Sequence, residues 1–268
     1  MKKEYYSTIK KYYNDDSKDF MNRSNHNSIL IKLRDNFRAE TDKVEFKNCL
    51  EIGFGSGLDL EYFCSNNKES NLYGIDISEG MYAETDKLLK SKNILNFNLK
   101  VGSIEDVKNL FIDQKFDHIY VHFGALNTVN NIEEVQYYFK EILTKEGKMV
   151  LTFVNKWYLM AILKPVLKLK IKKFKHRSRL GKVWGGYSPD NFIKSRCYSS
   201  KEIKTFFNEF EIEKKKGFCI LYPAWYEQRL VKKYPKITNL FWKVDTFLQN
   251  TFLWNFGEYT LYVFKNKK

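Results

Sequence analysis

The chain has 268 residues, of which 43% are hydrophobic and 29% are charged, a size that suits one large α/β domain with insertions. No run approaches the roughly 18 apolar residues that span a bilayer, and the amino terminus has no apolar core of a signal sequence. The four cysteines and four histidines show no metal-ligand spacing. We therefore expect a reduced, cytoplasmic protein without a metal site.

Positive charge is concentrated in the second part of the chain. Residues 1–155 contain 21 Lys and Arg and 24 Asp and Glu, whereas residues 156–268 contain 25 and 8, so the second part carries all of the net charge of +14. This asymmetry indicates an anionic partner: a phosphorylated substrate, an acidic carrier protein, a membrane surface or RNA. A lysine-rich surface that only keeps the protein soluble is the alternative.

The first predicted strand, Asn48–Ile52, follows a helical stretch and leads into a helix over Leu58–Cys64. The glycines Gly53, Gly55 and Gly57 join the two. Because glycine has no Cβ, this spacing lets the backbone turn sharply and approach a ligand closely. The dinucleotide pattern G-x-G-x-x-G would need its third glycine one residue later, so the spacing favours a different nucleotide-like cofactor.

An acidic residue, Glu51, stands two positions before the first glycine. This acid followed by G-x-G-x-G resembles the first motif of class I S-adenosylmethionine (SAM) methyltransferases, and the likeness extends over most of residues 45–221 and the terminal strand. The resemblance implies SAM as the cofactor. From this motif we expect the cofactor-binding residues Glu51, Gly53, Phe54, Gly55 and Gly57.

Asp76 closes the second predicted strand, Leu72–Ile75, just before a helix over Glu79–Leu89. Its two oxygens are placed to accept hydrogen bonds from both ribose hydroxyls of SAM. A helix cap before Ser78 is the alternative, since Asp favours that position. The resemblance also implies that Ile77 and Met81 contact the cofactor.

The third predicted strand, Phe97–Val101, leads into a segment that resembles the adenine-binding G-D-A-x-x-L segment of the family. Ser103 occupies the position of the usual aspartate, so an acidic acceptor for the adenine amino group is missing there. Ile104 is expected to pack on the ring, while a backbone carbonyl or Glu105 accepts the amine.

The fourth predicted strand, Ile119–Phe123, places His122 and Phe123 beside the transferable methyl. At about 3.3 Å per residue His118 lies roughly 13 Å away, at the opposite edge of the sheet, where we expect a structural role. His122 is the candidate catalytic residue, as a general base, and a structural histidine is the alternative.

The whole chain is predicted to form a single methyltransferase domain with an α/β, Rossmann-like, doubly wound sheet, mostly parallel, with an antiparallel carboxy-terminal strand pair. A helix over Ile132–Leu143 should end at a left-handed Gly147. A capping box at Ser199 should open a helix through Phe207. The remaining predicted strands are Met149–Val154, Phe210–Leu221 and Glu258–Phe264.

The parts outside this core are expected to cover the site. Residues 1–47 form a helical lead-in, 48–155 the SAM-binding core, 156–198 and 222–257 a basic and aromatic substrate cap, and 199–221 and 258–268 the closing helix and strands. Tyrosines and arginines in family lead-ins often reach the cofactor, which points to Tyr5-Tyr6, Tyr12-Tyr13 and Leu33-Arg34. The basic segment 161–177 is either a membrane-surface helix or an amphipathic cap helix.

SAM carries an activated methyl, so the protein must chiefly bind and align a nucleophile. We expect transfer to a small-molecule or lipid-like acceptor, anionic if the basic half meets it, most simply at oxygen. The [DN]-P-P-[YF] motif of amino-directed base methylases is absent after the fourth strand, which makes nucleic acid a less favoured acceptor. RNA methylation and a catalytically silent SAM-binding protein are the alternatives.

Overall fold

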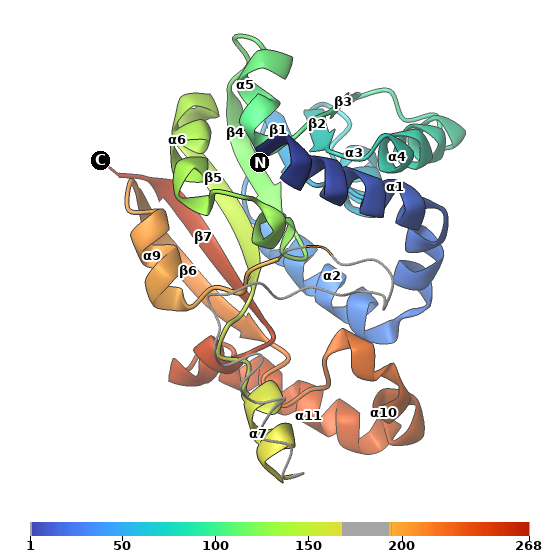
Figure 1. The fold of residues 1–268 in the computed structure, drawn as a ribbon, viewed down its shortest axis with the longest axis vertical. Coiled ribbons are helices and arrows are strands. Elements are labelled where there is room, and N and C mark those ends of the chain that lie inside the picture. The colour runs from blue at the N-terminus through green and yellow to red at the C-terminus, as the bar shows by residue number, and fades with distance from the viewer. Residues whose placement is uncertain (1, 168–192, 194, 268) are drawn as a thin grey trace.

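The computed structural model describes residues 2–167, 193 and 195–267, which form a seven-stranded sheet with helices on both faces (Figure 1). The strand order is β3-β2-β1-β4-β5-β7-β6. Strands β1 to β5 run parallel, and β7 runs antiparallel to both β5 and β6. The predicted doubly wound sheet and its antiparallel pair are confirmed. The strands are β1 (Asn48–Ile52), β2 (Asn71–Asp76), β3 (Phe97–Val101), β4 (Phe116–Val121), β5 (Leu143–Val154), β6 (Phe210–Phe218) and β7 (Tyr259–Asn266).

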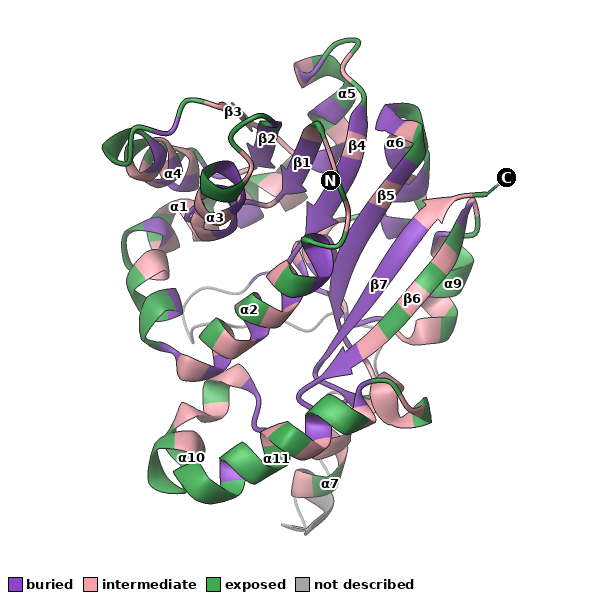
Figure 2. Cartoon of the chain, turned by 180° about the vertical axis from the view of Figure 1, so that it is seen from behind, coloured by how far each residue is buried: buried purple, intermediate pink, exposed green. Residues whose placement is uncertain are grey.

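Each face of the sheet is covered by its own set of helices and hydrophobic core. Helices α2, α3 and α4 pack on one face, and η1, α5, α6 and α9 on the other (Figures 1 and 2). Their bounds are α2 (Ser28–Thr41), α3 (Leu58–Asn66), α4 (Glu79–Ser91), η1 (Ile104–Asp106), α5 (Val107–Leu110), η2 (Ala125–Thr128), α6 (Ile132–Ile142) and α9 (Ser200–Phe206).

Strand β7 is buried on both faces of the sheet. It lies between β5 and β6, which pair with its two edges, and a hydrophobic core covers each of its faces. Tyr259 and Leu261 belong to the core on the α2 side, whereas Tyr262 and Phe264 belong to the core on the α6 side. Strand β7 therefore contributes side chains to both hydrophobic cores, near the β6 edge of the sheet.

The amino-terminal helix α1 (Lys2–His26) docks on the start of α4, beside the carboxyl end of β2. Asn14 Oδ1 accepts hydrogen bonds from Ser78 Oγ at 2.7 Å and from Gly80 N at 3.0 Å. A Cβ at Gly80 would lie only 2.5 Å from Ser17 Oγ, so the absence of a side chain lets the two helices touch. This contact holds α1 over the edge of the sheet where the parallel strands end.

The prediction that the helix over Ile132–Leu143, which is α6, ends at a left-handed Gly147 is wrong. The helix ends at Ile142, Leu143 is already extended, and Gly147 lies buried inside β5 without a positive φ. The register against β4 jumps from Phe116–Leu143 to His118–Lys148. A Cβ at Gly147 would lie 2.8 Å from the Leu143 side chain, so the glycine permits this irregularity instead of capping a helix.

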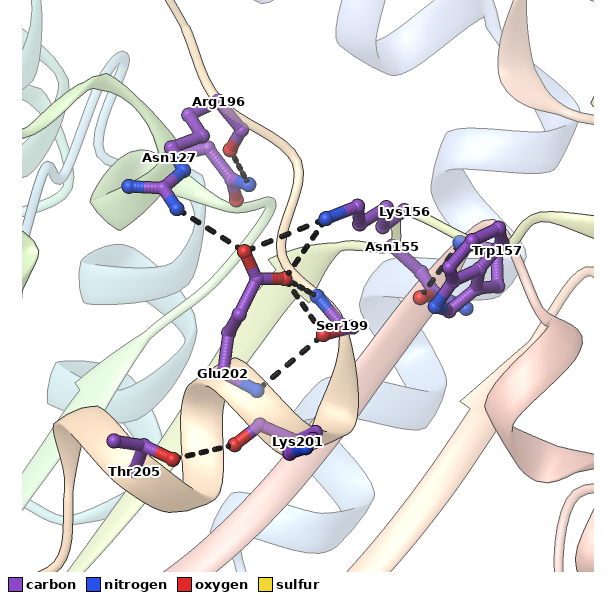
Figure 3. A network of polar contacts seen from close by, with 9 residues as sticks. All are labelled: Asn127, Asn155, Lys156, Trp157, Arg196, Ser199, Lys201, Glu202 and Thr205. Atoms are coloured by element: carbon purple, nitrogen blue, oxygen red, sulfur yellow. Dashed lines mark hydrogen bonds and ion pairs between the residues drawn. The ribbon is translucent and has the colours of Figure 1, made fainter. Parts of the chain in front are cut away.

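The capping box predicted at Ser199 is present and opens α9. Glu202 accepts hydrogen bonds from Ser199 N and Oγ, and it also meets the cations of Lys156 and Arg196 (Figure 3). Asn127 in η2 donates to the carbonyl of Arg196. These contacts tie the exits of β4 and β5 to the start of α9.

The two expected cap segments differ in how much of them is described. Residues 168–192 and 194 lie outside the described residues, and with them most of the basic segment 161–177. Residues 222–257 form helices at one end of the sheet (Figure 1). No helix in the described ranges is long and apolar enough to cross a membrane. The described part of the first cap segment contains α7 (Leu159–Leu167). The second contains η3 (Trp225–Glu227), α10 (Gln228–Lys233), α11 (Pro235–Leu248) and η4 (Phe252–Phe256).

Candidate cofactor and acceptor site

A cavity of about 810 Å³ lies where the parallel strands end, within the usual size range of small-molecule sites. Its walls follow the strand order: Ser103 comes after β3, Asp76 ends β2, Gly55 follows β1, Phe123 follows β4, and Tyr259 begins β7. Aromatic side chains of α1 form the opposite wall. One crevice therefore connects the predicted nucleoside end with the ends of β4 and β5.

The glycine loop has the backbone shape that its sequence predicts. Gly53, Gly55 and Gly57 have φ values of 73°, 55° and 74°, a left-handed region that side chains rarely adopt. A Cβ at Gly57 would lie 2.4 Å from Thr85 Cγ2, and a Cβ at Gly53 would lie 2.6 Å from the Ala125 Cβ. The loop thus needs glycine both for its bend and for its neighbours, and it leaves its inner side open to the cavity.

Asp76 lies at the cavity wall with 8% of its surface exposed. Its Oδ2 accepts from Gly55 N and its Oδ1 from Ser78 N, both at 2.9 Å. The helix-cap role belongs to Ser78, whose hydroxyl accepts from Met81 N at 3.0 Å. Each carboxylate oxygen keeps capacity for a further donor. Burial, opposed by the backbone N–H groups, raises the pKa of Asp76 to about 6.

This pKa predicts a pH dependence of ligand binding. Ribose hydroxyls donate best to the ionised carboxylate, so SAM affinity should be constant above about pH 7 and fall about tenfold per unit below pH 6. Folding stability depends on pH in the opposite direction. Because the pKa of Asp76 is raised in the folded protein, it stabilises the fold below the pKa of the unfolded chain, and this stabilisation is lost as the pH rises through 6. Calorimetric titration at pH 5–8 measures the binding effect. Asp76→Asn should bind more weakly with no such slope, and a steep slope in that variant would assign the effect elsewhere.

The other residues predicted on the nucleoside side also line the cavity. They are Ile77, Met81, Ser103 and Ile104. The Ser103 side chain forms a local cap, since its hydroxyl and its N–H both donate to Asp106 Oδ2 at 2.8 Å. Glu105, one of the two acceptors expected for the adenine amine, accepts a hydrogen bond from the Tyr6 hydroxyl of α1 at 2.9 Å.

His122 also lines the cavity, but its ring is only 2% exposed and both nitrogens lie close to protein groups. Nε2 lies 3.0 Å from Thr41 Oγ1, and Nδ1 lies 3.3 Å from Asp59 Oδ2. Burial lowers the pKa of His122, although the Asp59 carboxylate opposes this shift. A neutral imidazole that accepts from the Thr41 hydroxyl at Nε2 carries its proton on Nδ1, close to the Asp59 carboxylate but without the geometry of a hydrogen bond.

Asp59, which the sequence did not single out, is the centre of a buried charge network. Arg34 Nη1 lies 3.0 Å and Arg38 Nε 2.6 Å from its two oxygens, and the Asp59 side chain is 4% exposed. Burial alone would raise its pKa, but Arg34, His122 and Arg38 lower the pKa of Asp59 well below its ordinary value. The carboxylate therefore stays ionised and fixes both arginines.

Glu51 lies beside this network and lines the cavity. Its Oε2 accepts from the Tyr120 hydroxyl at 2.9 Å. Burial and the nearby charge of Asp59 raise the pKa of Glu51 well above its ordinary value. His118 lies away from the cavity lining, with Nδ1 3.0 Å from the Lys148 carbonyl.

The end of the cavity near β4 and β5 combines the aromatic side chains of Phe123, Trp225 and Tyr259 with small and polar residues. Phe123 has an unusual positive φ of 53° that turns the chain after β4, and the Arg34 guanidinium lies 4.7 Å from its ring centre. Trp225 and Gln228 close the wall. Their segment is tied to the α1–α2 junction, because Asn27 donates to the Trp225 carbonyl at 2.9 Å.

Residues 49–147 match a family described as "Methyltransferase domain". The chain contains a class I SAM-dependent methyltransferase domain. The cofactor of this domain is SAM, and Gly53 and Gly55, which line the cavity without a side chain, fit such a ligand. No group of side chains among residues 2–167, 193 and 195–267 has the composition of a metal site.

Solved structures share the fold of the methyltransferase domain. A SAM-dependent methyltransferase from Clostridium acetobutylicum ATCC 824 superposes with a TM-score of 0.55 at 15% identity, over 88% of this chain and 92% of that one. A coclaurine N-methyltransferase bound to N-methylheliamine and SAH gives 0.56 at 13% identity, over 88% of this chain and 72% of that one. At these identities the likeness concerns the fold.

One set of curated relatives matches by sequence. A tRNA (guanine-N(7)-)-methyltransferase from Campylobacter jejuni subsp. doylei is 29% identical over 101 residues, 37% of this chain and 26% of that protein. The chain thus spans about a quarter of the length of the curated relatives it matches.

Proposed function

We propose that this protein transfers a methyl group from SAM to an oxygen atom of a small-molecule or lipid-like acceptor. The proposal rests on one crevice that joins the glycine loop and Asp76 to a pocket with the aromatic side chains of Phe123, Trp225 and Tyr259. SAM supplies an already activated methyl, so the chain has to bind and orient the two reactants and to exclude water. A cavity roofed by a helix meets these needs.

The strand order supports an assignment of the cofactor residues. Ile104 and Ser103, at the end of β3, would hold the adenine; Asp76, at the end of β2, the ribose; and the glycine loop after β1 the methionine part. Arg34 lines the cavity beside the loop and is fixed by Asp59. We assign it to the methionine carboxylate, because a guanidinium pairs well with that group.

We place the acceptor at the end of β4 and β5, because the adenine and ribose positions assigned above take up the other end of the cavity. The lining residues from His122 to Val129, with Val154, Ser195, Trp225, Gln228 and Tyr259, include no carboxylate, and the Asp59 carboxylate beside His122 is already paired with Arg34 and Arg38. A cationic amine would be poorly stabilised there. A neutral hydroxyl compound with an apolar body fits better, which supports oxygen as the acceptor atom.

The general-base role of His122 stays a prediction that its contacts make testable. If His122 removes the hydroxyl proton, His122→Gln should lower kcat about 10²–10⁴-fold while SAM affinity stays within a factor of about two. The measurement needs an identified acceptor and calorimetry with SAM. An unchanged kcat would assign His122 to the Asp59 network alone.

RNA methylation is the second candidate. The tRNA methyltransferases that match 101 residues and the basic second half of the chain favour it. Against it, the described cavity reaches its acceptor end under α1 and η3, where an extruded base would need a wide entrance.

Methyl transfer from labelled SAM to a metabolite extract, to a lipid extract and to total tRNA distinguishes these candidates. The proposal predicts label in the metabolite or lipid fraction. Label in tRNA alone would replace it with the second candidate. SAM binding without transfer to any fraction would indicate a silent SAM-binding protein.

A further inference from the structure

Helix α11 buries polar residues and exposes apolar ones, the reverse of an ordinary surface helix. Its buried residues are polar, with Thr238 and Asp245 each 3% exposed. Its exposed residues include Ile237, Leu240 and Phe247, at 53%, 59% and 73%. Surface helices ordinarily bury the apolar stripe and expose the polar one, so the exposed apolar side chains require an explanation.

The buried polar side is an anchor that fixes this orientation. The Asp245 carboxylate accepts three backbone hydrogen bonds, from Ile220 and Leu221 at 2.8 Å and from Tyr222 at 3.0 Å. Trp242 packs edge-on against the Tyr222 ring. The helix is thereby attached to the turn after β6 through one side, and most of its other residues are exposed (Figure 2).

The outward residues form a continuous stripe. At 3.6 residues per turn, Ile237, Leu240, Val244 and Phe247 fall on one side of the helix. Lys236 and Lys243, seven residues apart, lie together along one edge of that stripe. An apolar stripe bordered by lysines is the pattern of helices that lie in a membrane interface.

The charged residues of α10, α11 and the segment up to Gly257 are almost all positive. Residues 228–257 contain five cations and one acid, and that acid is the buried Asp245. Within the part of the chain that the structure describes, none of the five cations is paired with a carboxylate. They are Arg229, Lys232, Lys233, Lys236 and Lys243, all exposed.

We propose that this surface attaches the protein to anionic membranes. The α10–α11 surface is defined by Arg229, Leu230, Lys232, Lys233, Lys236, Ile237, Leu240, Lys243 and Phe247. Its apolar stripe would enter the interface while the cations meet lipid phosphates. A nucleic acid needs no apolar stripe, and a second copy would bring like charges together.

The location of this surface links it to the cavity. Gln228, the first residue of α10, lines the acceptor end, and its amide donates to the His26 carbonyl at 2.6 Å. Attachment through α10 and α11 therefore holds the acceptor end of the cavity near the bilayer. The attachment itself does not depend on methyl transfer, so it can be tested without an acceptor.

Co-sedimentation with vesicles tests the proposal on the full chain. The protein should pellet with phosphatidylcholine vesicles that contain phosphatidylglycerol, and remain in solution with phosphatidylcholine alone. Lys236→Gln with Lys243→Gln should lower the partition coefficient about thirtyfold, since each lysine near an anionic surface contributes a factor of about five. Ile237→Ser with Leu240→Ser should lower it at least about tenfold.

Matched controls carry the same substitutions at exposed positions elsewhere: Lys68→Gln with Lys87→Gln, and Leu95→Ser with Ile112→Ser. Both should pellet like the wild type. Negligible pelleting of the wild type, or pelleting unchanged in both α11 variants, overturns the proposal. The proposal is also overturned if the wild type forms a dimer in the absence of vesicles and Ile237→Ser with Leu240→Ser dissociates it. It is overturned as well if the protein binds tRNA but not vesicles and the lysine variant abolishes the tRNA binding.

Discussion

Replacing Asp59 by alanine should lower the free energy of unfolding by about 3–5 kcal/mol, because it leaves two arginines without their shared buried counter-charge. For a domain of this size that corresponds to a fall in Tm of about 6–20 °C. Thermal unfolding followed by circular dichroism measures it. The ring of His122 also loses the carboxylate 3.3 Å from its Nδ1, so the damage extends from α2 to the end of β4.

Asp86→Ala is the matched control, since Asp86 also pairs with a cation, Lys90, but on the surface. Exposed pairs contribute little, so this variant should change the free energy of unfolding by less than about 1 kcal/mol. Equal effects of the two substitutions would show that the Asp59 network does not stabilise the fold as its burial implies.

Replacing Asp76 by alanine should weaken SAM binding at least about hundredfold. Two hydrogen bonds from ribose to a charged acceptor contribute about 1.5–3 kcal/mol each, and the substitution also removes the acceptor that fixes Gly55 N. Calorimetric titration of SAM at pH 7.5 gives the two dissociation constants.

Asp245→Ala provides a control of the same chemistry. Asp245 is also a buried carboxylate with a pKa raised to about 6 by burial, and it accepts backbone N–H groups, but it does not line the cavity. Its loss should lower Tm while the folded protein keeps its SAM affinity within a factor of about two. If Asp76→Ala and Asp245→Ala weakened binding equally, general destabilisation would explain the effect and the ribose assignment would be wrong.

The sequence predicted the sheet and the glycine loop well because their signals are local. Gly53, Gly55 and Gly57 each adopt the left-handed backbone that their residue type favours. The capping box at Ser199 was readable from four residues. Such features depend on neighbours along the chain, which one sequence displays directly.

Features built from distant segments were missed. Asp59 meets Arg34 and Arg38 from 25 and 21 residues away, across two elements whose packing the sequence does not specify. The roof of the cavity comes from α1, where only the tyrosine pairs gave a weak signal. The early start of β5 was missed because Lys145-Glu146-Gly147 reads as the end of the preceding helix. Residues 144–147 instead bulge between the pairs that Leu143 and Lys148 of β5 form with β4, and the distant Asn266 donates to the Thr144 carbonyl.

The structure of the protein in complex with S-adenosylhomocysteine tests the central assignment most directly. We predict both ribose hydroxyls within about 3.2 Å of the Asp76 carboxylate, the amino-acid part against the glycine loop, and the sulfur pointing toward Phe123. A ligand bound away from this crevice, or its ribose oriented away from Asp76, would contradict the account.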